Sequence, residues 1–443
     1  MKNLIDTIKN IWRIEELRNR ILITLGLLLV YRIGSFIVLP GVDSARLASD
    51  ASSSGGLVEL LSIFTGGAFT RASIFALGIM PYISASIIVQ LMGIAVPAVQ
   101  KMQREESGRR KLNQWTRYLT ILICVFQAPS YIYATIDANA RPDDTMWVFS
   151  SVIILTTSCL FVMWLGERIT ERGLGNGISL IIMIGIIANL PQSFIQEVVG
   201  RTGPGGGGLV LLLMEVVLWL LIIAGTILLV QGTRRIPVQF AKRVQGNKQY
   251  GGVRNYIPLK VNAAGVMPII FAQAIVMIPM YLAQAPFWGD TPPAFLISLS
   301  DFGGFWYNFM LFTMVVLFTY FYTAITVNPN QLADDMKRNG GFIPGVKPGK
   351  RTAAHIDDLL SRITLPGAIF LGFVAILPAF AIMGGVKQGF AQFFGGTSLL
   401  IMVGVLLDTL QQIESHLIMR HYDGLMKTGR IKGRTNAAFG LAG

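Results

Sequence analysis

The side chains that could perform acid–base or metal chemistry are few and scattered in this 443-residue chain. His355, His416 and His421 fall in or near polar segments, whereas Cys124 and Cys159 fall inside apolar runs. No Cys/His cluster has the spacing of a metal site, and two buried-type cysteines do not make a disulfide scaffold. We therefore expect no catalytic constellation, no metal and no cofactor.

One segment has the composition of a phosphate-binding loop but not its pattern. Residues 345–352 read GVKPGKRT. The phosphate loop needs glycine five residues before its Gly-Lys pair, where Pro344 stands, and Ser or Thr directly after the lysine, where Arg351 stands. The chain should not hydrolyse nucleotide, so energy for any work must come from a partner.

Three charged residues interrupt apolar runs and could belong to a proton path. Arg32, Glu215 and Asp408 are these residues. Intramembrane charges often mark ion pathways. A charge that reaches the interface or pairs between helices is the better interpretation here, because no two carboxylates form a relay at helical spacing.

The apolar runs are the elements that must position any functional group. Runs of about 20 residues are long enough to cross a bilayer as helices. The sequence predicts ten of them: 21–39, 73–96, 115–137, 146–165, 178–199, 209–232, 262–286, 306–327, 363–383 and 395–414. Hydrophobic residues make up 53% and charged residues 14% of the chain, against about 25% charged residues in soluble domains. We therefore expect an all-α, multi-pass membrane protein.

The basic residues lie almost entirely on one side of these spans. Of 37 lysines and arginines, 31 fall in the two termini and in alternate connections, and five fall in the other connections. The positive-inside rule then places both termini and the loops 97–114, 233–261 and 328–362 in the cytoplasm. The net charge of +13, gathered in these loops, indicates anionic lipid or an acidic cytoplasmic partner, with ribosomal RNA as an alternative.

The order of the spans predicts two inverted halves. Residues 21–199 hold five spans, 200–208 form a Gly-rich external linker, and 209–416 hold five more. An odd number of spans per half inverts the second half, as in membrane proteins whose functional path lies between their halves. Outside the halves, we interpret 1–20 as an amphipathic surface helix, with a frayed basic tail as the alternative, and 417–443 as a basic tail.

Two segments near the first connection have unusual patterns. Residues 57–64 are apolar but too short to cross, and Gly66, Gly67 and Arg71 follow them. Physics alone leaves a half-helix folded into the protein and an ordinary external loop equally open. In the second span, Ile79, Ile83 and Ile87 recur every four residues on one helical face, and Ser84 and Gln90 add polar groups.

From this span onward the sequence resembles the SecY family of protein-translocation channels. The similar blocks occur in family order: LGIMPYISASII at 77–88, WLGERITERGLGNGIS at 164–179, RRIPVQFAKR at 234–243, PLKVNAAGVMP at 258–268, NPNQLADD at 328–335, GFIPG at 341–345 and GGTSLLI at 395–401. Only the termini and outer loops depart. The resemblance implies a clamshell of two inverted five-helix halves.

The resemblance also implies roles for individual residues. A ring that closes the pore would consist of Ile79, Ile83, Ile182, Ile270 and Ile401, and a plug half-helix would occupy 57–72 with Leu60, Phe64, Gly66, Gly67 and Arg71. A lateral gate between spans two and seven would include Ser84, Ile87, Gln90 and Ile278. Such a channel would pass unfolded secretory chains across the membrane and release apolar segments sideways into lipid.

The implied partners are the motor ATPase SecA, the ribosome, the small membrane subunits SecE and SecG, and signal sequences. The motor or ribosome would dock on basic residues of the two long cytoplasmic loops: Arg234, Arg235, Lys242, Arg243, Lys347, Lys350 and Arg351. Lys347 departs from the family, which usually has arginine there. Lysine keeps the charge but loses the planar guanidinium.

Two other function classes stay open on the residues alone. An ion-coupled solute transporter would need a ligand-binding cluster near the midplane, which this sequence lacks. A scaffold or insertase would have no through-pore, so conductance after deletion of residues 57–72 would separate it from a channel.

Overall fold

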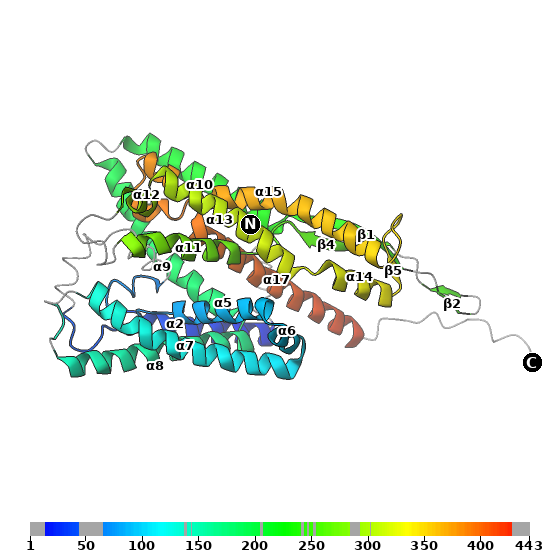
Figure 1. Ribbon diagram of the computed structural model, residues 1–443, viewed down its shortest axis with the longest axis horizontal. Helices are drawn as coiled ribbons and strands as arrows, with labels where there is room; N and C mark the ends of the chain where they lie inside the picture. The colour runs from blue at the N-terminus through cyan, green and yellow to red at the C-terminus, as the bar shows by residue number, and fades with distance from the viewer. Residues whose placement is uncertain are drawn as a thin grey trace, which may run out of the picture.

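The computed structural model describes residues 14–43, 65–136, 140–142, 144–203, 207–240, 243–245, 248–250, 254–283, 293–301 and 303–427, and it is mostly helical (Figure 1). The helices before the first strand are α2 (Glu15–Gly34), α5 (Met80–Ala95), α6 (Pro97–Arg104), α7 (Glu106–Thr135), α8 (Thr145–Arg172), α9 (Gly177–Thr202) and α10 (Gly208–Gln231). Those after it are α11 (Met267–Ala283), α12 (Ala294–Ser300), α13 (Phe305–Thr326), α14 (Pro329–Arg338), α15 (Lys350–Met383), α16 (Gln388–Ala391) and α17 (Gly396–Lys427).

One long helix corresponds to each predicted span. These helices are α2, α5, α7, α8, α9, α10, α11, α13, α15 and α17. By length and composition, six described helices could cross a membrane, and the bent pair of α5 and α6 would make a seventh. The chain is a multi-pass membrane protein, as predicted.

The first span begins earlier than predicted. The helix α2 starts at Glu15, so Arg18 and Arg20 belong to its first turns and not to a separate surface helix. Residues 1–13 of the predicted amphipathic segment lie outside the described residues. The helix ends at Gly34, short of the predicted 39, and Val38 then pairs with Ser73 in an isolated β-bridge.

The second span begins later than predicted, at Met80 and not at 73. Residues 66–79 form turns, interrupted by the bridge at Ser73. Gly78 has a φ of +52°, which favours glycine and ends any helix before it. Pro81 occupies the first turn of α5, where its missing N–H costs nothing; a helix from 73 would place this proline in its interior, against the carbonyl of Leu77.

The long helices form two groups with α9 and α17 between them. Figure 1 shows α2 and α5–α8 as a blue-to-cyan layer below and α11, α13 and α15 as a green-to-orange layer above. The helix α9 packs against α8 on one side and against α10, α16 and α17 on the other. This is the expected clamshell of two halves, joined along α9.

Two small β-sheets accompany the predicted helical architecture. Strands β1 (Thr233–Phe240), β4 (Arg254–Lys260) and β5 (Gly341–Phe342) form a sheet in the order β4-β1-β5, and β2 (Arg243–Gln245) pairs with β3 (Lys248–Tyr250). Ile236 and Val238 are buried while their neighbours are exposed, the period-two pattern of a half-buried strand. The register places Ile236 opposite Ile257. Thus the two long basic loops, 233–261 and 328–362, contribute to one small sheet.

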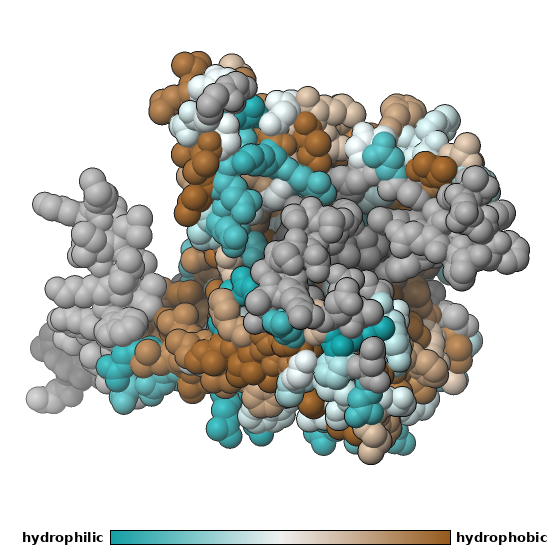
Figure 2. Space-filling view, turned by 90° about the vertical axis from the view of Figure 1, so that its left-hand side faces the viewer, coloured by the Kyte–Doolittle hydropathy of each residue, from teal (hydrophilic) through white to brown (hydrophobic). Residues whose placement is uncertain are grey.

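Apolar side chains cover much of the outer surface of the helices. Figure 2 shows continuous brown patches on this face of the molecule. On α10 the exposed residues include Val210, Leu213, Leu221 and Leu228. A surface of this kind is stable in lipid and would aggregate in water, so it supports the membrane assignment.

Candidate functional site

A cavity lies between the two halves. Its volume is about 450 Å³, and its lining comes from α5, α9, α11, α17 and the turns at 260–266. Polar residues line one end: Asn176 begins α9, and Lys260 ends β4. Asp408, also in the lining, lies seven residues beyond Ile401 on α17, about two turns. The cavity is therefore polar toward the sheet and apolar deeper between the halves.

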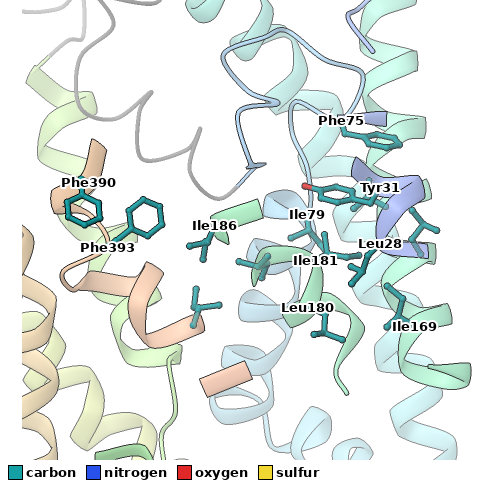
Figure 3. Packing of buried hydrophobic residues seen from close by; sticks show 14 of the residues in the cluster. Leu28, Tyr31, Phe75, Ile79, Ile169, Leu180, Ile181, Ile186, Phe390 and Phe393 are labelled. Carbon is teal, nitrogen blue, oxygen red and sulfur yellow. The ribbon is translucent and has the colours of Figure 1, made fainter. Parts of the chain in front are cut away.

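Four of the five predicted ring isoleucines line the cavity, and the fifth, Ile79, lies in the adjoining buried cluster. Ile83, Ile182, Ile270 and Ile401 line the cavity. Ile79, Ile182 and Ile401 belong to one buried cluster, and Ile83 packs against it. Figure 3 shows part of this cluster, which extends from Leu28 and Tyr31 on α2 to Phe390 on α16 and Phe393 just after it. Side chains from both halves therefore meet at the isoleucines.

Ile79 is held in place by a cap and not by a continuous helix. It is the N-cap residue of α5, and its carbonyl accepts a hydrogen bond from the Ile83 N–H at 3.1 Å. This bond keeps the Ile79 and Ile83 side chains one turn apart, as the predicted helical face required. The sequence predicted that both residues lie within one helix, whereas α5 begins at Met80, between them.

The described part of the predicted plug, 65–72, is a series of turns packed against α2, α7 and α9. Leu60 and Phe64 lie outside the described residues. Gly66 and Gly67 are buried, with φ of +66° and +83°. Arg32 Nη1 donates to the Gly66 carbonyl at 3.3 Å. A Cβ added at Gly66 would lie 3.1 Å from the Gly185 Cα on α9, so glycine is needed both for its conformation and for this close approach.

Three further contacts hold the same turns. The Tyr131 hydroxyl of α7 donates to the Phe69 carbonyl at 2.6 Å, and Thr65 Oγ1 accepts from the Phe69 N–H at 3.1 Å. The Arg71 guanidinium lies over the Phe36 ring, 4.6 Å from its centroid. Arg32, which the sequence left without a role, thus connects the first span to the described part of the predicted plug.

The predicted lateral-gate residues lie along α5 and α11. Ser84 is exposed, and its hydroxyl donates to the Met80 carbonyl at 3.2 Å; Ile87 and Gln90 line the central cavity. Ile278 is on α11, with its side chain outside the described set. A second cavity of about 150 Å³ separates the end of α5 from α11 and α13, between Gln90, Phe271 and Tyr322. The two helices are therefore not sealed against each other at this end.

The predicted docking residues gather around the small sheet. Arg234 and Arg235 are exposed on β1, Lys347 is exposed in the turn before α15, and Lys350 and Arg351 are exposed at the start of α15. Thr352 Oγ1 donates to the Lys347 carbonyl at 3.0 Å, which fixes the backbone of the tip. Arg243 begins β2 with its side chain outside the described set, and Lys242 lies outside the described residues altogether.

The predicted external linker contains a structural residue that sequence reasoning missed. The helix α9 continues to Thr202, so Arg201 is helical and not part of a flexible linker. Its guanidinium pairs with Glu197 at 3.0 Å and with Glu215 of α10. Glu215 is thus paired between helices, which was the better of its two interpretations. The i,i+4 spacing of Glu197 and Arg201 is the signal that could have found the pair.

Among the residues described, no group of three or more His, Cys, Asp or Glu side chains could hold a metal ion. Asp408 is the one carboxylate in the described lining of the central cavity. The geometry is that of a passage lined by aliphatic and small polar groups.

Comparison with known proteins identifies close relatives. The family model described as SecY matches residues 73–410. The chain is 40% identical to "Protein translocase subunit SecY" of Mycobacterium tuberculosis (strain ATCC 25618 / H37Rv), over 94% of this chain and 98% of the relative. It is also 40% identical to the protein of that name from Escherichia coli (strain K12), over 94% and 96%.

Solved structures share the fold at lower identity. One described as "The structure of a protein conducting channel" aligns with a TM-score of 0.58 and 16% identity, over 94% of this chain and 95% of that one. Another, "Cryo-EM structure of idle yeast Ssh1 complex bound to the yeast 80S ribosome", aligns with a TM-score of 0.60 and 14% identity, over 89% of each chain.

Proposed function

Because this chain belongs to the SecY family, we propose that it forms a protein-conducting channel that passes unfolded secretory polypeptides across the membrane. The observation that carries this proposal is the central cavity between the halves, with isoleucines from α5, α9, α11 and α17 along its lining. The family consists of translocase subunits, so the chain is a channel component and not an enzyme.

The isoleucine ring provides the seal of this channel. Aliphatic constrictions exclude water and ions by dewetting. They make no specific bonds with a passing chain, so they can part around many sequences and close again. Ile79, Ile182 and Ile401 are buried in the common cluster, which supports a closed resting state. The turns at 65–72 and the segment before them act as the plug behind the ring.

The helices α5 and α11 form the lateral gate. The 150 Å³ cavity between α5 and the α11–α13 pair supports this proposal, because it leaves space between the two helices. An apolar signal sequence that binds between these helices would stabilise the open state and shift the population toward it. Transmembrane segments would leave into lipid by the same route.

The partners follow from the cytoplasmic surface and from the family. One similar structure is described as "Sec61 in the Canine ribosome-channel complex from the endoplasmic reticulum", which supports a ribosome as one partner here. The exposed basic residues near β1 and at the 347–351 tip also suit an acidic surface of the motor SecA. SecE and SecG are the small membrane subunits of the complex, and both termini face the cytoplasm from the inner membrane.

Resting conductance of the reconstituted channel tests the ring. Ile83→Gly combined with Ile270→Gly should make the resting channel leak ions, because the loss of two aliphatic side chains lets water wet the constriction. Ile83→Val and Ile270→Leu are the matched controls and should change conductance little, since volume and apolarity nearly persist.

If the double glycine variant is folded in normal amounts and keeps the parental conductance, the isoleucine ring is not the seal. Deletion of 57–72 gives a second arm: a rise in conductance supports a through-pore, and no rise supports a scaffold or insertase.

A further inference from the structure

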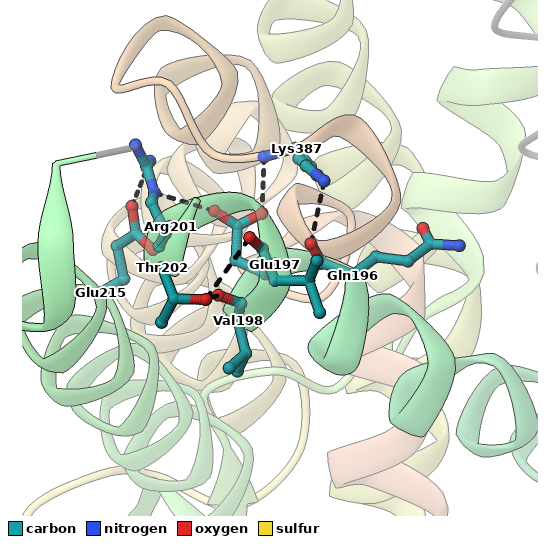
Figure 4. Close-up of polar contacts among 8 residues, drawn as sticks. Gln196, Glu197, Val198, Arg201, Thr202, Glu215 and Lys387 are labelled. Atoms are coloured by element: carbon teal, nitrogen blue, oxygen red, sulfur yellow. Dashed lines mark hydrogen bonds and ion pairs between the residues drawn. The ribbon is translucent and has the colours of Figure 1, made fainter. Parts of the chain in front are cut away.

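A buried ion cluster ties together three segments at the external end of α9. Its members are Glu197 and Arg201 on α9, Glu215 on α10 and Lys387 in the connection between α15 and α16 (Figure 4). Glu197 Oε1 accepts from Arg201 Nε at 3.0 Å, and Oε2 accepts from the Lys387 backbone N–H at 2.8 Å. Lys387 Nζ donates to the Gln196 carbonyl at 2.9 Å. Glu197 is therefore the centre of the cluster.

Because the charges of this cluster are buried, the loss of one ion pair should be costly. Glu197 is 1% exposed, and the side chain of Arg201 is 12% exposed. A buried charge that loses its partner costs far more than an exposed one. The pair of Arg117 on α7 and Glu167 on α8 provides a contrast, because its side chains are 50% and 26% exposed and both helices belong to the same half.

Aromatic side chains pack beside the ion cluster, where α9, α10 and α16 meet. Trp219 Nε1 of α10 donates to the Phe393 carbonyl at 2.8 Å. The Phe390 ring of α16 packs against Phe194 of α9 at 5.6 Å and against Trp219 at 5.7 Å between centroids. Polar and aromatic contacts thus join α9, the last helix of the first half, to α10 and α16 of the second half.

The segments joined by these contacts are continuous in sequence with residues of the isoleucine ring. Ile182 lies on α9, the helix that carries Glu197 and Arg201. Phe390, Phe393 and Phe394 belong to the same buried cluster as Ile182 and Ile401, and they precede α17, which carries Ile401. The attachment of α9 to α16 thus acts together with the direct packing of α9 on α17 in placing Ile182 of one half relative to Ile401 of the other.

We propose that Glu197, Arg201 and Glu215 are positioning residues for the pore seal. Their ion pairs and hydrogen bonds hold the outer end of α9 against α10 and α16. In this arrangement the two halves close with Ile182 and Ile401 in contact. This inference rests on the proposed ring. The cluster itself touches neither the passing chain nor the cavity, so it acts on the ring only through α9, α10 and α16.

The experiment compares Glu197→Gln with Glu167→Gln in the purified, reconstituted channel complex. Glutamine keeps the size of Glu197 but removes one of the two carboxylate charges that pair with Arg201, and it replaces the charged acceptor of the Lys387 N–H by a neutral amide. We expect the resting conductance of Glu197→Gln to rise roughly tenfold, which corresponds to a shift of about 1.4 kcal/mol in the closed–open equilibrium. Glu167→Gln, at the exposed pair, should keep the parental conductance.

A distance measurement separates positioning from a general loss of stability. Spin labels at Tyr118 on α7 and Phe373 on α15, both exposed, report the separation of the halves; labels at Tyr118 and Phe149 on α8 report on one half alone. In Glu197→Gln the first distance distribution should broaden and the second should stay unchanged. Broadening of both would mean that the cluster has only a structural role and would overturn the inference.

The ring variant serves as the reference for interpreting the result. If Ile83→Gly with Ile270→Gly leaks while Glu197→Gln has parental conductance and an unchanged distance between halves, the positioning role is wrong and the channel assignment stands. If Ile83→Gly with Ile270→Gly does not leak, the isoleucines are not the seal, and the positioning role of the ion cluster is wrong as well.

Discussion

At the scale of single residues, Lys347 stands where the resemblance to the family leads us to expect arginine. Its side chain is exposed at the tip before α15, between turns that contain Pro344, Gly345 and Gly349. The Thr352 hydroxyl binds its carbonyl at 3.0 Å. The tip is therefore fixed through its backbone, which leaves the ammonium group to meet a partner in solution.

Reversal of this charge should impair export driven by the motor. We expect Lys347→Glu to lower SecA-driven export of a secretory precursor at low salt by about tenfold or more, because it places like charges across the interface. Lys347→Arg should export at least as well as the parent, and resting ion tightness should be normal in both. Parental export by Lys347→Glu at low salt would mean that this lysine only fixes topology.

At the scale of elements, the small sheet is the base that holds the basic tip and the β1 arginines together. Ile236 and Val238 of β1, Leu259 of β4 and Ile356 of α15 share one buried cluster with Met336 of α14. Pro237 is tolerated in β1 because β5 pairs only with Gln239 and Phe240, which leaves the edge beside the proline open. Both cytoplasmic loops therefore depend on the same core.

Loss of volume in this core should uncouple the cytoplasmic surface from the pore. Ile236→Ala should destabilise the sheet by roughly 2–5 kcal/mol and reduce motor-driven export while resting conductance stays normal. Thermal unfolding in detergent and reconstituted export measure the two effects. Tyr256→Ala on the exposed face of β4 is the matched control. Equal export by both variants would show that the buried core of the sheet is dispensable for coupling.

At the scale of the whole molecule, the orientation in the membrane follows from charge. The sheet, the 347–351 tip and the start of α2 should all face the cytoplasm, since 31 of 37 basic residues lie on that side of the spans. Figure 1 shows β1, β4, β5 and α14 at one end of the molecule, with α12 at the other. The two ends can therefore be labelled separately.

Cysteine labelling tests this orientation. A cysteine replacing Tyr256 should react with a membrane-impermeant reagent only after the membrane is opened, whereas one replacing Asp301 should react in intact cells. Cys124 and Cys159 are buried and should contribute little background. Labelling at 256 in intact cells would overturn the topology.

Much of this architecture is predictable from the sequence. The ten spans follow from the length of apolar runs, because a helix is what satisfies its own backbone in lipid. The two inverted halves follow from the number of spans on each side of the Gly-rich segment. The family motifs named the five isoleucines, and the structure brings four of them to one cavity, with Ile79 in the adjoining cluster.

What only the tertiary structure decided concerns contacts between distant segments. The pairing of β1 with β4 and β5 depends on residues about 20 and 100 positions away, and local alternation cannot specify such partners. The start of α5 at Met80 depends on turns held by Tyr131 and Arg32 from other helices. Arg201 resembled a linker residue because its second carboxylate partner is on another helix. Hydropathy determines which segments enter the membrane, but the pairing of buried charges is decided only once the helices pack.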